Sequence, residues 1–428
     1  MPTENIRLRA PLNVLHKQTP RHKLTTVYHL VKDLKWILLL LKVFGIIPLF
    51  QIVHAFKLTP PKTRSYSTFY TSFMRIIAFL VVVLDALLIF TPTGGAMIFV
   101  YGELDNATIA LQILLSIAIY GLIMWKSAFK PPHFITIINS LLNVDKALQL
   151  HPRAPAALHN NCAFHKVYVG LLVMQSSCTI WVINWVRVKK YSSQLLCVGL
   201  YFFHLKRAAA FNGYIIFVAT LLHLLAVRFR YLNNFIEMYT TKEDFYENLP
   251  KQSATHANMR QEGDEGNELA MQYFAIDALF FYRMHNKLLE IYKMLNDYVR
   301  SVLLFFIAHF FYASSMTAYQ LYFVAEMDKN FQIKSLFWCG IFICVYVPVA
   351  ALLMSCCDAA TKEIDKFLSK NIKQDVQFTA YGFFAIDKST LFKMCSAITT
   401  YLVILIQFRQ LENSRSMSST ANKINDGN

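Results

Sequence analysis

The chain has 428 residues, of which 55% are hydrophobic and 16% are charged, whereas an ordinary soluble domain is about 25% charged. Several apolar stretches approach the roughly 20 residues that a helix needs to cross a bilayer. The composition therefore favours a polytopic membrane protein over a soluble one. We assign the formal net charge of +16 to basic cytoplasmic loops rather than to nucleic-acid binding.

The N-terminal part contains an arm and an unusual apolar segment. Residues 1–35 are polar and basic and contain no apolar signal-peptide core, so we expect a cytoplasmic arm. Residues 36–56 are apolar but are interrupted by Lys42, Gly45 and Pro48. Because basic residues flank this stretch on both sides, a crossing would leave excess positive charge on both faces of the membrane. We predict an interfacial or re-entrant helix, with a crossing as the alternative.

Seven later stretches have the composition of membrane-spanning helices: Phe69–Phe90, Thr108–Trp125, Val167–Val186, Phe211–Val227, Val302–Phe323, Leu336–Cys356 and Leu391–Phe408. They predict a simple organisation along the chain. Its parts are 57–227 with four spans, a connector at 228–300, 301–356 with two spans, a connector at 357–390, the last span at 391–408, and a tail at 409–428.

The charges of the loops predict the orientation of the spans. The loop Thr91–Ala107 contains acidic but no basic residues, and we place it outside together with its N-glycosylation sequon at Asn106. The connectors after the second and sixth spans are rich in basic residues, which places them inside. One predicted outer connector disagrees, because it holds Arg187, Lys189, Lys190, Lys206 and Arg207. The majority predicts a cytoplasmic N-terminus and an extracellular C-terminus.

Two spans are expected to continue as helices below the membrane. In the connector 228–300, apolar residues recur at helical spacing, as at Leu288, Ile291 and Leu295, up to the start of the fifth span. Residues Thr361–Leu368 extend the sixth span in the same way. The predicted fold class is an all-α membrane protein of seven transmembrane helices, with cytoplasmic helix extensions that pack into an anchor bundle.

The sequence gives no sign of catalysis. It lacks the Walker loop, G-x-S-x-G and H-E-x-x-H motifs, and its eight cysteines are scattered without metal-ligand spacing. We therefore expect no enzymatic activity, no cofactor and no metal site. His223 and His309 lie at predicted membrane depth, where packing is the favoured interpretation and a ligand contact or proton relay is the alternative. Arg207 is interpreted as a cation that reaches from a helix end into water.

The outward halves of four predicted spans combine aromatic rings with small polar groups. An apolar pocket with a few hydrogen-bonding groups is what a small-molecule site requires, whereas the alternative is an aromatic belt at the membrane surface. Because the combination recurs on several helices, we predict a ligand site formed by Trp181, Trp185, Asn212, Tyr214, Tyr312, Ser315, Tyr319 and Trp338.

The last span carries polar groups that an anchoring helix would not need. Thr399, Thr400, Tyr401 and Gln407 interrupt its apolar sequence. A polar side chain at membrane depth must face protein or water rather than lipid. We therefore interpret Leu391–Phe408 as a helix that lines an aqueous path.

Three sequence features resemble those of one receptor family. Thr400-Tyr401, followed by five apolar residues and then Gln407-Phe408, resembles the C-terminal TY-x5-QF signature of insect gustatory receptors. Residues 382–384 (Gly-Phe-Phe) and Asp387 resemble the segment that precedes this signature, and Gly45 to Pro48 is similar to the family's early Gly-x-x-Pro stretch. The family motif residues are thus Thr400, Tyr401, Gln407 and Phe408.

The resemblance implies a ligand-gated, non-selective cation channel of four subunits, related to insect odorant receptors. It would lie in the plasma membrane of chemosensory neurons, bind a small tastant, conduct monovalent and divalent cations, and assemble with itself or with related subunits. The seventh helix of such receptors surrounds the pore. The implied pore-lining residues are Tyr401, Ile404, Leu405, Gln407 and Phe408.

Two other protein classes and the choice of tastant stay open at this point. A G-protein-coupled receptor also has seven helices, but its N-terminus would lie outside and no DRY or NPxxY motif is present. A transporter would show broken helices or internal symmetry. The sugar-sensing branch of the resembled family commonly has Glu where this chain has Leu402, so bitter-type and fructose-type receptors fit better.

Overall fold

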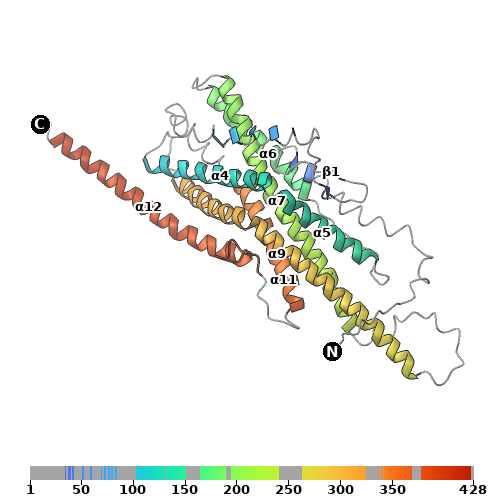
Figure 1. Cartoon of the computed structure of the whole chain (residues 1–428). Coiled ribbons are helices and arrows are strands. Elements are labelled where there is room, and N and C mark those ends of the chain that lie inside the picture. Colours follow the sequence, from blue (N-terminus) through green and yellow to red (C-terminus); the bar gives the residue numbers. More distant parts are fainter. Residues whose placement is uncertain are drawn as a thin grey trace, which may run out of the picture.

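The computed structural model describes residues 103–129, 131–150, 164–188, 194–240, 263–323, 342–368 and 377–425, with short pieces between residues 34 and 83 and at 336 and 339–340. Its helices form an elongated bundle (Figure 1). The elements in chain order are β1 (Gln51–Ile52), β2 (Leu58–Thr59), α4 (Glu103–Phe129), α5 (Pro131–Leu150), α6 (Phe164–Val188), α7 (Gln194–Thr240), α9 (Gly263–Phe323), the π-helix η4 (Phe342–Tyr346), α11 (Val347–Leu368) and α12 (Lys388–Asn425).

Four of the described helical segments are long and apolar enough to cross a membrane: Lys206–Asn234, Leu279–Tyr319, Ile343–Lys366 and Lys388–Phe408. They overlap the fourth to seventh predicted spans, although the second begins well before the predicted Val302 and the third begins and ends later than predicted. The predicted second and third spans lie within α4 and α6, and residues 69, 72–73, 76–77, 79–80 and 82–83 of the first are helical, while the rest of it lies outside the described residues. A helical membrane protein with several apolar spans is thereby confirmed.

The long helices run without a break from one predicted compartment into another. Helix α9 has 61 residues, about 90 Å at 1.5 Å per residue, and joins the connector to the fifth span as predicted. Helix α11 likewise includes Thr361–Leu368. Helix α7 is longer than expected and begins at Gln194. Lys206 and Arg207 therefore lie inside a helix, at the start of the candidate span Lys206–Asn234, rather than in a connector.

Helix α7 occupies the centre of the bundle. In the most apolar 18-residue stretch of its candidate span, 89% of the residues are buried. In the corresponding stretch of α12, only 11% are buried. Helices α6, α9 and α11 all pack along α7, and in Figure 1 α7, α9 and α11 run along the long axis of the molecule. The C-terminal part of α12 instead projects beyond the other helices. The core thus surrounds α7, while α12 keeps one side of its length uncovered.

Helix α5 was not expected, because the sequence interpretation treated residues 126–166 as a basic connector. Pro131 suits a first helical position, where no N–H is needed. Phe134, Ile138, Leu141 and Leu148 recur at helical spacing and are all buried. Helix α5 packs on α9 and β2. The amphipathic pattern of these residues lies within a segment whose basic charge is typical of a cytoplasmic connector.

The apolar segment at 36–56 also differs from its prediction. Leu34, Ile37, Leu38 and Leu41 belong to the buried core, so the described part of this helix packs against other parts of the protein, and its interfacial or re-entrant position stays a prediction. Gln51 then pairs with Thr59 in an antiparallel ladder, so the helix does not continue to residue 56. Pro48 disfavours that continuation because its ring clashes with the preceding turn. The remaining residues of the segment lie outside the described ones.

Candidate functional site

Buried polar side chains meet where α6, α7, α9 and η4 pack together. The Asn212 side chain donates from Nδ2 to Gln175 Oε1 at 2.9 Å, and Gln175 is also hydrogen-bonded to the Tyr346 side chain. Gln175 and Asn212 are buried. Polar groups at membrane depth pair with one another because lipid offers no partners. The polar cluster, as we call Gln175, Arg207, Asn212, His309 and Tyr346, therefore joins three helices and the π-helix.

Aromatic rings form one wall of the polar cluster. The Phe211 ring lies 5.4 Å from Phe306, 5.5 Å from His309 and 6.0 Å from Tyr346 between centroids. His309 and Tyr346 lie 6.3 Å apart. These tilted and edge-to-face arrangements favour the attraction between ring edges and ring faces. The site thus combines an aromatic surface with hydrogen-bonding groups, which suits a small organic molecule.

The π-helix places Tyr346 in the cluster. Pro348 has no N–H, so the α-helical hydrogen bond back to the Cys344 carbonyl cannot form. Residues 342–346 are wound as a π-helix that ends two residues before this proline. Single-turn π-helices inside α-helices are frequent at functional sites. The direction of the Tyr346 side chain therefore depends on a local irregularity in the predicted sixth span.

Arg207 and one acceptor atom complete the cluster. Arg207 is half-buried and acts electrostatically on both His309 and Tyr346. The Asn212 Oδ1 atom is buried and has no hydrogen-bond partner among the described residues. A buried acceptor without a partner costs about 1–3 kcal/mol. The cluster therefore offers an acceptor to a bound molecule, beside the positive charge of Arg207.

The structure places the predicted ligand-site residues in different parts of the bundle rather than in one site. Asn212 belongs to the polar cluster, whereas Tyr214, two residues further on, is buried on the opposite side of α7. Ser315 is buried and donates to the Phe311 carbonyl oxygen at 2.9 Å. Tyr312 and Tyr319 pack against α12. Trp181 and Trp185 lie in α6 with side chains outside the described set, and Trp338 lies outside the described residues.

Sequence reasoning missed most of the polar cluster. Gln175 is a lone amide in an apolar segment, a signal that was available. Arg207 was assigned to a helix end because the early start of α7 was not recognised. His309 was assigned to packing, and its ring contacts are consistent with that interpretation. Tyr346 depends on the π-helix, which sequence periodicity does not reveal.

A second cluster joins α9 to the last helix. Tyr312, Met316, Tyr319 and Leu405 form a separate buried group, against which Leu115, Tyr401 and Leu402 pack. The rings of Phe311 and Tyr401 lie 6.3 Å apart. We call this the α9–α12 contact. Its tyrosines come from α9 within ten residues of His309, so one helix bears both clusters.

Helix α12 has one covered and one open face. Leu405 is 5% exposed and lies against α9, whereas Ile404 is 40% and Phe408 59% exposed. Gln407 and Thr400 are exposed as well. Of the implied pore-lining residues, Ile404, Gln407 and Phe408 therefore share the open face, while Leu405 and the half-buried Tyr401 face the bundle.

The motif before α12 forms a tight hairpin. The Ile386 N–H donates to the Phe378 carbonyl at 2.7 Å, and Gly382 at its tip has φ 81°, a conformation that favours glycine. Asp387 accepts hydrogen bonds from the Thr390 N–H at 2.7 Å and from its hydroxyl at 2.8 Å, which caps the start of α12. These residues of the recognised motif thus set where the last helix begins.

Two ion pairs hold the predicted cytoplasmic half of α7. Arg228 Nε and Nη2 donate to the two carboxylate oxygens of Asp145 on α5, each at 2.6 Å, and both residues are buried. Arg230 Nε donates to Glu363 of α11 at 2.9 Å. Burial raises the pKa of Glu363, but hydrogen bonds from Arg230 and Asn233 outweigh it and leave that pKa below its ordinary value. Helices α5 and α11 are thereby fixed to α7.

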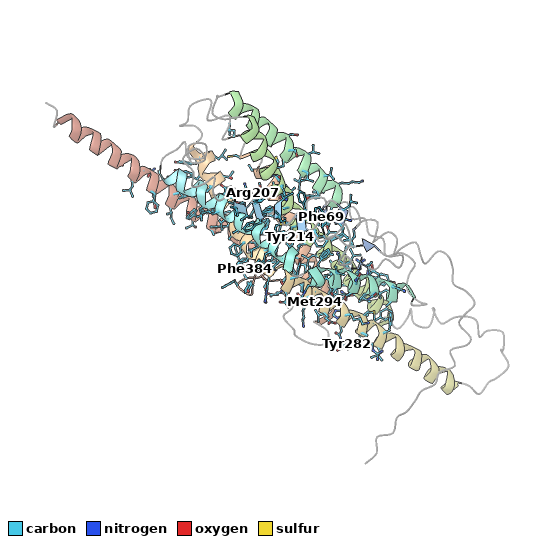
Figure 2. The ribbon with its side chains drawn as sticks, turned by 45° about the horizontal axis from the view of Figure 1, so that its top comes forward. Phe69, Arg207, Tyr214, Tyr282, Met294 and Phe384 are labelled. Atoms are coloured by element: carbon cyan, nitrogen blue, oxygen red, sulfur yellow. The ribbon has the colours of Figure 1, made fainter. Side chains whose placement is uncertain are left out.

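Figure 2 separates these regions along the bundle. Arg207 and Tyr214 of α7 lie toward one end, Tyr282 of α9 lies toward the other, and Phe384 and Met294 lie between them. The polar cluster is thus remote from the lower part of α9. No group of three or more metal-binding side chains occurs among the residues that the structure describes.

Comparison with known proteins identifies relatives of the whole chain. A family model described as "7tm Chemosensory receptor" matches residues 34–366 and 351–412. Gustatory and pheromone receptor 32a of Drosophila melanogaster is 34% identical over 410 residues, which are 90% of this chain and 86% of that protein. Gustatory receptor 68a of the same species is 79% identical over 52 residues, 12% of this chain and 13% of that protein. The solved insect olfactory receptor OR5 from Machilis hrabei, in complex with eugenol, has a TM-score of 0.54 at 11% identity and covers 89% of this chain and 99% of its own.

Proposed function

The chain belongs to the 7tm chemosensory receptor family, and we propose that it is a tastant-gated, non-selective cation channel in the plasma membrane of chemosensory neurons. In this proposal seven helices cross the membrane, with the N-terminus inside and the C-terminus outside. Four copies, or copies together with related subunits, surround one pore. The observation that carries the proposal is the open face of α12, where an exposed amide lies among exposed apolar side chains.

The open face of α12 has the chemistry of a pore wall. A helix facing only lipid would not place Gln407 on its uncovered side, because each unpaired polar group in lipid costs several kcal/mol. In a ring of subunits, Gln407 amides would replace part of a cation's hydration shell. Phe408 and Ile404 on the same face would narrow the path and exclude water when it is closed. The shared fold with an olfactory receptor is consistent with this assembly.

We place the tastant at the polar cluster. Its aromatic wall and hydrogen-bonding groups come from helices that must move relative to one another to admit a molecule. Relatives named as gustatory receptors, and an olfactory receptor solved with eugenol, support a small organic ligand. The ligand shifts the equilibrium toward the open channel only by as much as it binds that state more tightly.

Helix α9 is the proposed link from ligand to pore. It presents His309 to the polar cluster and Tyr312, three residues later, to the α9–α12 contact. Because packed cores switch between arrangements rather than deform continuously, a displacement of α9 that admits a ligand repacks Tyr312 and Tyr319 against Leu405. In the proposed mechanism this draws α12 away from the pore axis.

The test is electrical. The chain is expressed in cells with G-protein signalling blocked, and current is recorded during application of sugars and bitter compounds. We expect a tastant-evoked cation current that persists under the block. A current that the block abolishes would favour the competing class, a receptor that signals through G proteins. If the chain alone is silent at the cell surface, co-expression with related receptors tests the mixed assembly.

A further inference from the structure

We propose that Lys393 forms a ring of positive charge at the cytoplasmic mouth of the proposed pore, and that this ring repels divalent cations more strongly than monovalent ones. The inference rests on the proposed function, because it names the ions that the same pore favours. Neither the fold nor the relatives specify such a preference. The observations that carry it are the position of Lys393 on the open face of α12 and the lack of any Asp or Glu in residues 388–408.

Lys393 is in line with the polar residues of the open face. Its side chain is exposed, as are those of Thr400 and Gln407. At 100° per residue, these three positions lie within about 40° of one another around α12. Met394 and Leu405, on another side of the helix, are buried against the bundle. The surroundings that receive the Gln407 amide therefore also receive the Lys393 ammonium group.

The two residues lie at opposite ends of the proposed pore wall. The candidate span of α12 runs from Lys388 to Phe408. Lys393 precedes Gln407 by fourteen residues, which corresponds to about 21 Å along the helix, against about 30 Å for the hydrocarbon core of a bilayer. With the C-terminus outside, Gln407 is near the outer end and Lys393 near the cytoplasmic end. Four copies of the chain thus bring four ammonium groups to the cytoplasmic mouth.

The described part of the protein supplies no counter-charge to Lys393. The candidate span contains Lys388 and Lys393 but no Asp or Glu. Lys388 Nζ lies 3.8 Å from Asp358 Oδ2 on α11, whereas no ion pair involves Lys393 among the described residues. Thr400, on the same face, is neutral and donates its hydroxyl to the Ser396 carbonyl at 3.3 Å. The two lysines of α12 thus differ, because only Lys388 has its charge balanced by a described carboxylate.

A lipid-facing position for Lys393 is the alternative. Lysines near helix ends often extend along the helix to reach lipid headgroups. The alignment with Gln407 argues against this position, because a neutral amide at membrane depth must face protein or water. A water-filled path satisfies both side chains at once.

The charge of a cation decides how strongly the ring acts on it. Electrostatic energy is proportional to the charge of the ion, so the Boltzmann factor for a divalent cation is the square of the factor for a monovalent one. A ring that reduces monovalent flow about threefold reduces divalent flow about ninefold. Na⁺ and K⁺ are affected alike, so the pore stays unselective among monovalent cations. The ring also depletes cations at the cytoplasmic mouth, which makes outward current smaller than inward current.

The experiment records single-channel currents in inside-out patches from cells that express the full chain. Spontaneous openings are used, because a minor open state is populated without a ligand. The cytoplasmic face is bathed in NaCl and then in CaCl₂, each at about 0.1 M ionic strength, where the Debye length is about 10 Å. Lys393→Gln should raise outward Na⁺ current at least about twofold, and outward Ca²⁺ current by about the square of the Na⁺ factor. Lys393→Arg should keep the native currents.

Lys388→Gln is the matched control. It removes the same charge five residues away, but about 140° around α12 and from a lysine that is already paired. We expect native currents from this variant. Salt supplies a second control, because at about 1 M the Debye length falls to about 3 Å. The difference between Lys393→Gln and the native chain should then largely disappear.

The other outcomes separate this inference from the proposed function. Openings whose Na⁺ and Ca²⁺ currents are the same in Lys393→Gln and the native chain would overturn the inference alone and favour a lysine that reaches lipid headgroups. Equal factors for Na⁺ and Ca²⁺, or an equal effect of Lys388→Gln, would also overturn it. If the native chain shows no openings, alone or co-expressed with a related receptor, the proposed channel is contradicted and this inference with it.

Discussion

Three segments approach closely at Gly213. A Cβ atom at this position would lie 2.5 Å from the Tyr168 hydroxyl oxygen and 2.8 Å from Leu41 Cδ2. The Tyr168 hydroxyl donates to the Ala209 carbonyl at 2.8 Å. The lack of a side chain at Gly213 therefore allows the N-terminal helical piece, α6 and α7 to meet.

Substitution of Gly213 by Ala should destabilise the protein. The added methyl group has to displace the Tyr168 ring, which breaks its hydrogen bond, and overpacking of this kind costs about 1–3 kcal/mol. The Tm of the purified chain measures the effect. Gly170→Ala on α6 is the control, because nothing lies within 4 Å of a Cβ there. An equal loss in both variants would show that close packing at Gly213 is not the cause.

His285 should make stability depend on pH. Its ring packs against Phe229 at 5.2 Å, and burial lowers the pKa of His285 to about 4 from 6.5. Between these values the unfolded chain binds a proton that the folded chain does not, so stability falls as pH falls from 6.5 toward 4. The loss should be on the order of 3 kcal/mol, at about 1.4 kcal/mol per pKa unit.

Unfolding curves between pH 4 and pH 7 test this dependence. His285→Leu should show a smaller decrease of Tm across that range than the native chain. His133→Leu, at an exposed position on α5, should show the native decrease. A decrease that His285→Leu leaves intact would assign the pH response to other groups.

At the scale of elements, the buried ion pair between Asp145 of α5 and Arg228 of α7 should affect the free energy of unfolding far more than exposed ion pairs do. Asp145→Asn leaves the Arg228 cation buried without its counter-charge, which costs about 3–5 kcal/mol. Replacement of both residues, by Asp145→Leu with Arg228→Met, should recover most of that loss because no charge stays buried. The fraction of solubilised protein that elutes as folded assembly after mild heating measures both variants.

The control is the exposed pair on α9. Asp297 and Arg300 lie 3.3 Å apart, but their side chains are 68% and 45% exposed. Asp297→Asn should change the free energy of unfolding by less than about 1 kcal/mol, because water screens such pairs. If Asp145→Asn were as mild as Asp297→Asn, α5 would not be held by its ion pair.

The elements that the sequence predicted well are those with long, uninterrupted patterns. Continuity of α9 followed from apolar residues at helical spacing that run into an apolar span without glycine or proline. Helix α5 was missed because the basic charge of its connector hid a similar pattern. The surroundings of the N-terminal helix could not be read from its sequence, because apolar residues that pack on α7 look like those that lie on lipid. Composition alone does not separate these two environments.

The candidate site was less predictable for a related reason. Asn212 could be named because it combines with aromatic neighbours in a pattern that recurs on several predicted spans. Its partner, Gln175, is 37 residues earlier, and only the packing of α6 on α7 brings the two together. The aromatic and polar character of Tyr312 and Tyr319 suggested a ligand site. In the structure, both lie on the face of α9 that packs against α12. Sequence thus identified polar groups, whereas their grouping required the fold.

For the assembled molecule, the open face of α12 should control permeation. Gln407→Ala should alter conductance or the relative permeability of cations, because the proposed pore loses a ring of amides. Surface expression should stay intact, because Gln407 is exposed in the protomer. Reversal potentials in mixed-ion solutions measure the change. Gln410→Ala, at another exposed position of α12, should leave permeation less affected. Unchanged permeation in Gln407→Ala would remove this residue from the pore.

The length of α9 has a mechanical consequence. A continuous helix of 61 residues behaves as a rod of about 90 Å, so a tilt of about 2° displaces one end by about 3 Å relative to the other. His309 lies near one end of this lever, and Gly263 is at the other, on the predicted cytoplasmic side. A protein bound to the cytoplasmic end of α9 would thus change the free energy that a ligand must supply to tilt the helix. In the proposed channel, sensitivity to the ligand would then be set from the cytoplasmic side without any change at the proposed ligand site.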